Sequence, residues 1–158
     1  MLCWVDSMNR LPLEALEQIY SERLRQNIGR ASYSCAVNDF FHYLRMDFFP
    51  QGGRYCLWEE KGEYVAAVRF LPFNDGLLLA GLETAPTHRR NGFATRLLTA
   101  ALYELDGKES LPIYSHVHMN NKPSLKIHQD CGCRVAFDYA VLLDGTVSSR
   151  YSTLLRSL

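Results

Sequence analysis

The sequence has no excess of charge of either sign, no long apolar run and no low-complexity linker. Lys and Arg together number 17 and Asp and Glu together number 17, so the formal net charge is zero. A general nucleic-acid binder needs net positive charge to meet phosphates, so we expect no nucleic-acid partner. No apolar stretch approaches the roughly 18 residues that span a bilayer, so we expect no membrane partner either. Without a linker, residues 1–158 are expected to form a single domain.

Cysteine is present but shows no pairing pattern. The five cysteines are odd in number and scattered along the chain, and the first residues lack the basic start and apolar stretch of a signal peptide. We therefore expect free thiols and a cytoplasmic location. The apolar fraction of 47% is high enough to bury a core, so disorder is not expected. A neutral globular chain of this kind fits an enzyme for a small substrate or an interaction module.

Apolar periodicity alternates between the helical and the strand pattern along the chain. Strands are expected at 2–6, 54–60, 63–73, 76–85, 112–119 and 134–143, and helices after Pro12 and over about 37–48, 89–104 and 121–131. Lys61-Gly62 predicts a tight hairpin and Asn74-Asp75-Gly76 a second turn, and Gly29 is expected to end the first helix. Residues 134–143 fit either a final strand or a hairpin closed after Asp144-Gly145. The order predicts an α/β fold with a mixed sheet.

The most informative stretch is the turn that follows residues 76–85. That apolar run suits a central strand buried on both faces, and the helix after it opens with the pattern Arg-x-x-Gly-x-Ala at Arg89, Gly92 and Ala94. The first amides of a helix lack internal partners, and the helix dipole adds positive charge there, so such a turn can hold a phosphate. The same glycine can also serve only tight packing. Residues 84–103 carry three arginines and no acid, which favours the phosphate.

The turn resembles the cofactor motif of the GNAT superfamily, the acetyl-CoA-dependent N-acetyltransferases. Residues 89–94, Arg-Arg-Asn-Gly-Phe-Ala, are similar to the family pattern Gln/Arg-x-x-Gly-x-Gly/Ala. About 30 residues downstream, Asn121, Ser124 and Gly132 keep the spacing of a second family motif. Two positions depart from that motif, because His128 stands where Tyr is usual and Cys133 where Phe is usual.

The resemblance implies a single-domain α/β fold in which helices flank a mixed central sheet and two parallel strands splay apart around acetyl-CoA. It also implies that the amides from Arg90 to Thr95 bind the pyrophosphate and that Asn121 holds the cofactor's arm. For Asn121, a simple helix N-cap is an equal alternative. The cofactor-binding residues implied in this way are Leu82, Thr84, Arg89, Arg90, Asn91, Gly92, Phe93, Ala94, Thr95, Asn121 and Ser124.

Three side chains are candidates for proton transfer. His128 takes the place of the family's usual acid, the motif tyrosine, and a histidine can protonate a thiolate well; the alternative is a half-buried helix residue without that role. Strand alternation puts His116 and His118 on one face. His116 lies five residues before Asn121, a position where some members of the GNAT family carry a catalytic Glu, so the resemblance favours His116 over His118. Glu83 interrupts an apolar run, so it faces a cavity, a partner or a substrate amine, and it competes equally with His116 as the base or substrate anchor. The alternative for Glu83 is a structural pair with one of the arginines or histidines. Arg69 interrupts another apolar strand and would bind an acidic group of the substrate or face solvent.

The predicted function is transfer of an acetyl group from acetyl-CoA to a primary amine of a small molecule, by direct attack, in a monomer or homodimer. The departure at His128 motivates an alternative, a module of the same fold that binds acyl-CoA without turnover. A third possibility is a metal site made by His128, Cys131 and Cys133, with His116 or His118 as the fourth ligand. Structural zinc usually shows tighter cysteine pairs, so we expect no metal.

Overall fold

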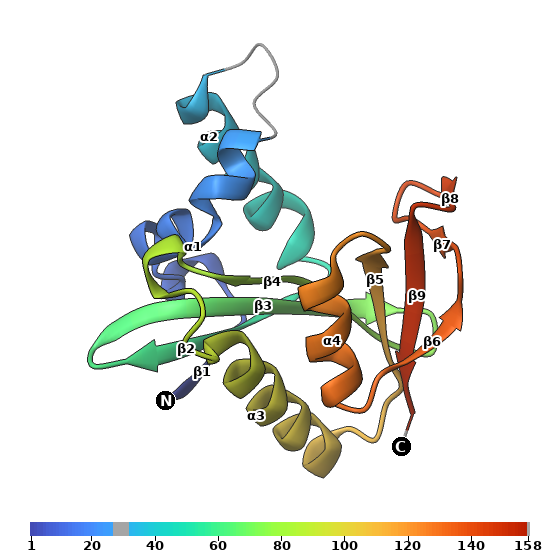
Figure 1. Cartoon of the computed structure of the whole chain (residues 1–158). Coiled ribbons are helices and arrows are strands. Elements are labelled where there is room, and N and C mark those ends of the chain that lie inside the picture. Colours follow the sequence, from blue (N-terminus) through green and yellow to red (C-terminus); the bar gives the residue numbers. More distant parts are fainter. Residues whose placement is uncertain (27–31, 158) are drawn as a thin grey trace.

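The computed structural model describes residues 1–26 and 32–157, and Gly29, the predicted helix stop, lies outside them. The helices are α1 (Leu13–Gln26), α2 (Tyr33–Tyr43), α3 (Phe93–Lys108) and α4 (Lys122–Asp130). The strands are β1 (Leu2–Val5), β2 (Arg54–Glu60), β3 (Glu63–Phe73), β4 (Gly76–Thr84), β5 (Ile113–His118), β6 (Arg134–Phe137), β7 (Ala140–Val141), β8 (Val147–Ser148) and β9 (Tyr151–Arg156). One sheet has the order β1-β2-β3-β4-β5-β9-β6, and β7 and β8 form a separate pair (Figure 1).

Helices cover both faces of the sheet, which gives the predicted α/β architecture. In Figure 1, α1 and α2 lie on one side of β3 and β4, and α3 lies on the other. The first layer buries Leu16 and Tyr20 of α1 against β2 and β3. The second layer buries the whole apolar stripe predicted for α3, namely Phe93, Leu97, Leu98, Ala101, Leu102 and Leu105. The spacing of three and four residues thus identified the buried face of α3 correctly.

The predicted helix over residues 37–48 is built from two pieces. Helix α2 ends at Tyr43 and continues as a π-helical turn over Leu44–Phe48. Leu44 and Phe48 are buried, whereas Phe40 and Phe41 are only partly buried at the edge of the same cluster. A π-helical turn is wider than an α-helical turn and alters the spacing of the apolar positions. The apolar stripe predicted with a period of 3.6 residues is therefore only partly buried in the core.

The predicted hairpin at Lys61-Gly62 and the predicted turn at Asn74-Asp75-Gly76 are both present. The pairing of β3 with β4 also contains an irregularity that bends β4. Ala67 pairs with Glu83 and Arg69 pairs with Ala80, so two residues of β4, Gly81 and Leu82, stand opposite one residue of β3. Gly81 has a φ of 61°, a left-handed conformation that glycine adopts without strain. The result is a β-bulge that bends the second half of β4.

The central parallel strands separate soon after they meet, as the family resemblance implied. β4 and β5 pair only at Leu77–Leu79 with Ile113–Ser115. Beyond this pairing, the residues from Ala80 to Thr84 are all partly exposed. The prediction that the whole run 76–85 is buried on both faces is therefore wrong for its second half. That half leaves the core because β4 bends away from β5 at the bulge.

The C-terminal region contains a strand that the sequence pattern did not reveal. Residues 134–143 contain two strands, β6 and the short β7, and β7 makes a hairpin with β8. The predicted strand and the predicted hairpin are therefore both present, each in shorter form. The last strand, β9, lies between β5 and β6 and is antiparallel to both. Its insertion extends the sheet from β5 and fixes the far wall of the gap that opens beside β4.

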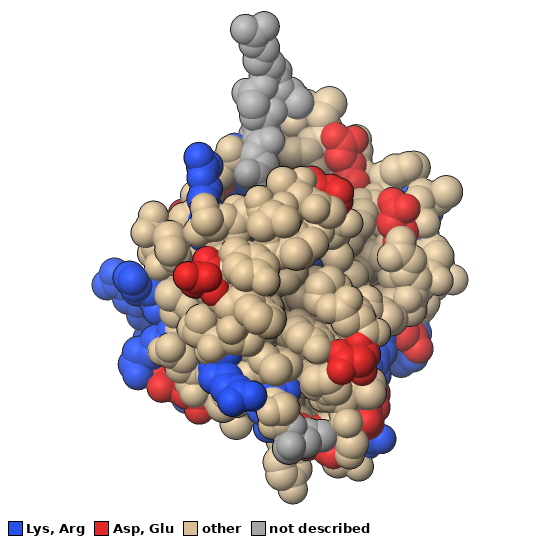
Figure 2. Space-filling view, turned by 90° about the vertical axis from the view of Figure 1, so that its right-hand side faces the viewer, with Lys and Arg blue, Asp and Glu red and all other residues tan. Residues whose placement is uncertain are grey.

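The C-terminal strands present a largely uncharged surface. Figure 2 views the molecule from their side, and uncharged residues cover most of the middle of that face. Six large apolar side chains of this region are exposed: Val135, Phe137, Tyr139, Val141, Leu143 and Val147. Among the described residues, no helix is long and apolar enough to cross a membrane.

Candidate active site

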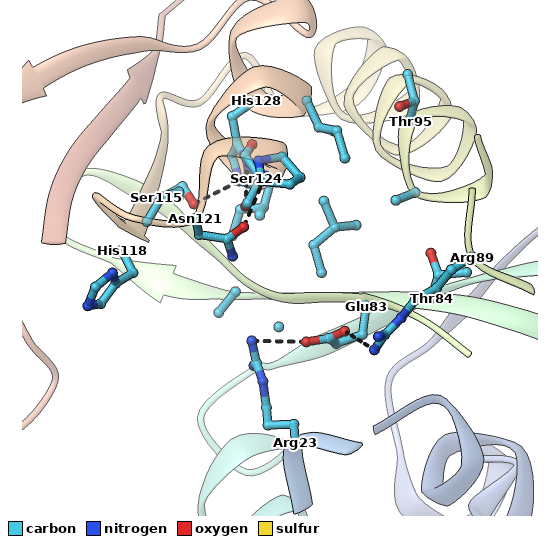
Figure 3. A pocket seen from close by; sticks show the side chains of 18 of the residues that line it. Arg23, Glu83, Thr84, Arg89, Thr95, Ser115, His118, Asn121, Ser124 and His128 are labelled. Carbon is cyan, nitrogen blue, oxygen red and sulfur yellow. Dashed lines mark hydrogen bonds and ion pairs between the residues drawn. The ribbon is translucent and has the colours of Figure 1, made fainter. Parts of the chain in front are cut away.

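A cleft of about 780 Å³ opens where β4 and β5 part, and the predicted site residues converge on it. Its walls come from α1, the second half of β4, the start of α3, β5 and α4 (Figure 3). Every residue predicted to bind the cofactor or to transfer a proton lines this cleft except Asn91, and Arg69, the candidate substrate contact, does not line it either. The cleft therefore brings together two sequence motifs that lie about 30 residues apart.

The turn before α3 has the backbone of an anion site. The helix begins at Phe93, four residues later than the periodicity predicted, because Arg89 to Gly92 form the turn itself. Arg90 and Gly92 both have left-handed φ values, 63° and 75°. Asn91 does not face the cleft; its side-chain amide donates to the carbonyl oxygens of His88 and Arg89 at 3.1 and 3.2 Å. Asn91 thus stabilises the turn from outside.

The first amides of α3 are free to bind an anion. Gly92 is the N-cap and supplies no side-chain hydrogen bond to them, and the first amides of a helix have no acceptor within it. A Cβ built on Gly92 would meet nothing within 4 Å, so the space in front of these amides is open. An α-helix of this length also directs positive dipole charge to its N-terminus. The residues present therefore fit the pyrophosphate of a cofactor such as acetyl-CoA.

The second half of β4 offers its backbone to the cleft. Residues Ala80 to Thr84 pair with β3 on one edge, but among the described residues no strand pairs with their other edge. The bulge there is held by α1, because the Tyr20 hydroxyl donates to the carbonyl oxygen of Gly81. Burial raises the pKa of Tyr20 well above its usual value, so the hydroxyl keeps its proton. The free edge at Leu82 and Thr84 can receive an extended ligand as a strand would.

Helix α4 closes the opposite wall. Asn121 is its N-cap, and its side-chain oxygen accepts a hydrogen bond from the Ser124 amide at 3.2 Å. The N-cap alternative for Asn121 is therefore confirmed, and Asn121 also lines the cleft (Figure 3). Ser124 lies one turn before His128 and brings its carbonyl oxygen to that ring.

His128 is buried and both of its ring nitrogens are engaged. Nδ1 lies 2.7 Å from the carbonyl oxygen of Ser124 and Nε2 lies 3.0 Å from the hydroxyl of Ser115. A carbonyl oxygen can only accept, so Nδ1 carries the proton of the neutral ring and Nε2 accepts from Ser115. Burial lowers the pKa of His128, although the bond to Ser124 opposes the shift. The ring is therefore neutral at neutral pH.

Glu83 lies among arginines rather than free in the cleft. Its carboxylate is 3.2 Å from the Arg23 guanidinium and 3.8 Å from that of Arg89 (Figure 3). Arg89 also contacts Glu22, so two acids and two arginines form one network between α1, β4 and the turn. Burial raises the pKa of Glu83, and the arginines oppose this shift. The basic charge that the sequence concentrates at residues 84–103 is thus partly neutralised at Arg89.

His116 and His118 share one face of β5, as strand alternation predicted. The pattern is regular, since Ser115 and Val117 are buried and the two histidines are partly exposed. His116 packs edge-on against Phe73, and His118 packs against Tyr151. Burial lowers the pKa of His116. His116 therefore lines the cleft as a neutral imidazole at neutral pH.

Sequence reasoning missed several contributors to the cleft. Ser115 reaches His128, Tyr20 anchors the bulge, and Arg23 holds Glu83. The partners in the two hydrogen bonds are 13 and 61 positions apart in the chain, so no local spacing in the sequence reveals them. A signal existed only for the bulge, because a lone glycine inside a strand pattern, here Gly81, is typical of one.

No metal-binding arrangement accompanies this cleft. Within residues 1–26 and 32–157, no group of three or more His, Cys, Asp or Glu side chains is placed to hold a metal ion. All five cysteines are free. Cys133, at the position of the motif Phe, is buried in a small apolar cluster with Val117 and Leu154, where it acts as a small apolar side chain.

Comparison with known proteins agrees with this geometry. Residues 13–133 match the sequence model of the Acetyltransferase (GNAT) family. The chain belongs to the GNAT family. The turn before α3, the bulged β4 and the parted strands are accordingly parts of a GNAT fold. No curated protein matches the chain in sequence.

Solved GNAT structures resemble the chain over its full length. Aminoglycoside 6'-acetyltransferase type Ii has a TM-score of 0.72 at 12% identity, covering 99% of this chain and 96% of that one. The PaiA N-acetyltransferase of Thermoplasma acidophilum, crystallised with coenzyme A, has a TM-score of 0.67 at 11% identity, covering 100% and 99%. The ribosomal-protein-S18-alanine N-acetyltransferase of Escherichia coli has a TM-score of 0.65 at 16% identity, covering 100% and 96%. At these identities the likeness concerns the fold.

Proposed function

We propose that this chain transfers an acetyl group from acetyl-CoA to a primary amine of a small molecule by direct attack. The observation that carries the proposal is the single cleft in which the open N-terminus of α3 faces an unpaired strand edge of β4. The PaiA N-acetyltransferase, which has a similar fold, was crystallised with coenzyme A, and this supports the cofactor. Zero net charge and five free thiols fit a cytoplasmic enzyme that does not bind nucleic acid. Monomer and homodimer are both compatible with it.

Each wall of the cleft has a task in this proposal. Acetyl-CoA supplies the acetyl group as an activated thioester. The amides between Arg90 and Thr95 bind its pyrophosphate, and Arg89 and Arg90 add positive charge. The backbone of Leu82 and Thr84 holds the pantetheine arm, and one of these two amides polarises the carbonyl. Asn121 and Ser124 complete the opposite wall.

The reaction forms one N–C bond, breaks one C–S bond, takes a proton from the amine and gives one to the sulfur. We assign the first proton to His116, because it is neutral and lines the cleft. Glu83 is the second candidate base, but its two arginine partners favour a role in holding the turn against α1. His128 is the candidate acid, and the donor would be its imidazolium form, because Nε2 of the neutral ring carries no proton. The imidazolium would give its Nε2 proton to the Ser115 oxygen while the Ser115 hydroxyl gives its own proton to the sulfur, which leaves His128 neutral.

One observation favours the alternative, a module that binds acyl-CoA without turnover. His128 replaces the motif tyrosine, and both of its ring nitrogens are already bonded within the protein. A neutral, fully bonded imidazole gives up a proton less readily than a free phenol or imidazolium does. Catalysis would then lack its acid while the cofactor cleft stayed intact.

A binding experiment combined with an activity experiment separates the two functions. Isothermal titration with CoA should show binding in both cases, whereas thiol release from acetyl-CoA with a panel of amines should occur only for the enzyme. Binding without release for any amine would establish the binding module and refute the transferase.

The role of His128 is tested by two substitutions. His128→Ala should lower turnover about 10²-fold or more while changing CoA affinity far less, and His128→Tyr should restore part of the turnover. The alanine variant also leaves Ser115 without its partner, so unfolding must be measured beside activity. Equal loss of turnover in both variants, with both folded, would exclude His128 as the acid.

A further inference from the structure

A row of four side chains crosses the sheet beside the cleft, on the face covered by α1 and α2. Tyr55 of β2 pairs with Arg69 of β3, and Arg69 pairs with Ala80 of β4. Leu79 pairs with Ser115 of β5, and Ala80 and His116 are the next residues of these two strands, at the point where the strands begin to part. Residues two positions along these strands, such as Leu71 and Leu78, pack in the cluster under α1 and α2, so alternation places the row on that face.

Arg69 packs against aromatic rings. Its guanidinium carbon lies 5.7 Å from the ring centre of Tyr43 and 6.0 Å from that of Phe48. Among the described residues, no carboxylate lies within ion-pair distance of it. Four other arginines do have such a partner: Arg23, Arg54, Arg89 and Arg156. Arg69 is therefore a partly buried cation in a neutral aromatic setting, and such a charge is costly without an anion.

A second polar group, next to Arg69, also lacks a hydrogen-bond partner in the described part of the chain. The Tyr55 hydroxyl beside it is buried and has no hydrogen-bond partner among the described residues. Tyr20 is committed to the carbonyl oxygen of Gly81. A Cβ on Gly81 would come within 3.3 Å of Arg69 Nε, so the guanidinium lies directly against the bulge whose residues line the cleft.

The position between Arg69 and His116 is occupied by a methyl group only. Ala80 stands there, and Ala80, Gly81 and His116 all line the cleft. Paired strands are about 4.8 Å apart, and β4 and β5 are no longer paired at this row, so the backbones of β3 and β5 are more than about 10 Å apart there. Arg69 itself is not among the residues that line the cleft, so its guanidinium would reach a ligand over Ala80 and Gly81, which do line it.

We propose that the acceptor is an amine that also carries a carboxylate, an amino-acid-type substrate, with its carboxylate on Arg69 and its amine at His116. This inference rests on the proposed acetyl transfer and names the substrate class of that site. A carboxylate matches the single charge of one guanidinium and its two-pronged geometry. A phosphate dianion would leave one negative charge uncompensated among the aromatic rings.

The first test compares acceptors that differ only in the carboxylate. Free α-amino acids and their amides are each measured for thiol release from acetyl-CoA, at matched concentrations of the unprotonated amine. We expect KM for the acids to be lower by about tenfold or more, the usual effect of a charge-assisted hydrogen bond. Equal KM values for acids and amides, or a preference for the amides, would overturn the proposal while leaving acetyl transfer intact.

The second test removes the cation. Arg69→Gln should raise KM for the acids about tenfold or more, leave KM for the amides nearly unchanged, and change kcat little, whereas Arg69→Lys should recover part of the affinity. Arg45→Gln is the matched control, because Arg45 is exposed in the neighbouring π-helical turn. A variant that lost acids and amides alike would indicate a structural role for Arg69 and would refute the carboxylate site.

A binding readout distinguishes failure of this inference from failure of the transferase. Amino acids and amides are titrated calorimetrically into the protein loaded with CoA, which requires no turnover. Selective binding of acids that Arg69→Gln abolishes would support the site even if no amine released thiol. Absence of selective binding beside measurable turnover of neutral amines would overturn only the carboxylate.

Discussion

At the scale of single residues, the cleft separates groups that are held by the protein from groups that are free to act. Glu83 is held by Arg23 and Arg89, and His128 by Ser115 and Ser124. His116 makes an aromatic contact with Phe73. Glu83 and His116, which the sequence left as equal candidates for the base, therefore differ in the structure. The His116 ring is neutral at neutral pH and can accept a proton, which favours His116 as the proposed base.

The pH dependence of turnover tests this choice. Burial lowers the pKa of His116 from 6.5, and the neutral form that accepts a proton exists above the pKa. We expect kcat/KM to fall as the pH falls through a midpoint below 6.5, well separated from titration of an amine acceptor near pH 9 to 10. In His116→Gln this acidic limb should disappear. Loss of the limb in Glu83→Gln instead would assign the base to Glu83.

At the scale of elements, the start of α3 carries the cofactor proposal. Gly92 has a left-handed backbone, and open space surrounds its missing side chain. Valine in that conformation is strained by about 1–2 kcal/mol and places its branches in front of the free amides. We expect Gly92→Val to weaken CoA binding about tenfold or more while the fold persists, as measured by titration calorimetry and by circular dichroism.

Gly145 provides a matched control for the same helix start. It also has a left-handed φ, 84°, and open space around it, but it does not line the cleft. Gly145→Val should therefore cost similar stability and leave CoA binding unchanged. Unchanged affinity in Gly92→Val would eliminate the phosphate assignment.

Elements with strong local signals could be predicted from the sequence, and those that depend on distant partners could not. The α3 stripe and the Lys61-Gly62 hairpin follow from spacing and turn chemistry. β9 was missed because residues 151–156 are a short segment that becomes a strand only by inserting between β5 and β6. The bulge at Gly81 and the contact of Ser115 with His128 depend on tertiary packing in the same way, so motif spacing located the cleft but not its internal bonds.

At the scale of the whole molecule, a ligand in the cleft would touch both parts of the sheet. One wall comes from β4 and α3 and the other from β5 and α4. Binding to the native state alone stabilises it by about 2.7 kcal/mol at a ligand concentration of 100 times Kd. For a chain of this size we expect Tm to rise by about 5–10 °C, and Gly92→Val should lose most of this rise at the same CoA concentration. Thermal unfolding with and without CoA measures it, and an unchanged Tm at saturation would contradict the proposed site.

The short parallel pairing of β4 with β5 also bears on how long the protein survives. Within residues 1–26 and 32–157, the pairing of β4 with β5 comprises three residue pairs, so it is a natural place for local opening and for attack by proteases. A cofactor that lies across the opening replaces the missing strand contacts. With acetyl-CoA bound as proposed, the chain should therefore be cleaved by proteases more slowly than without it.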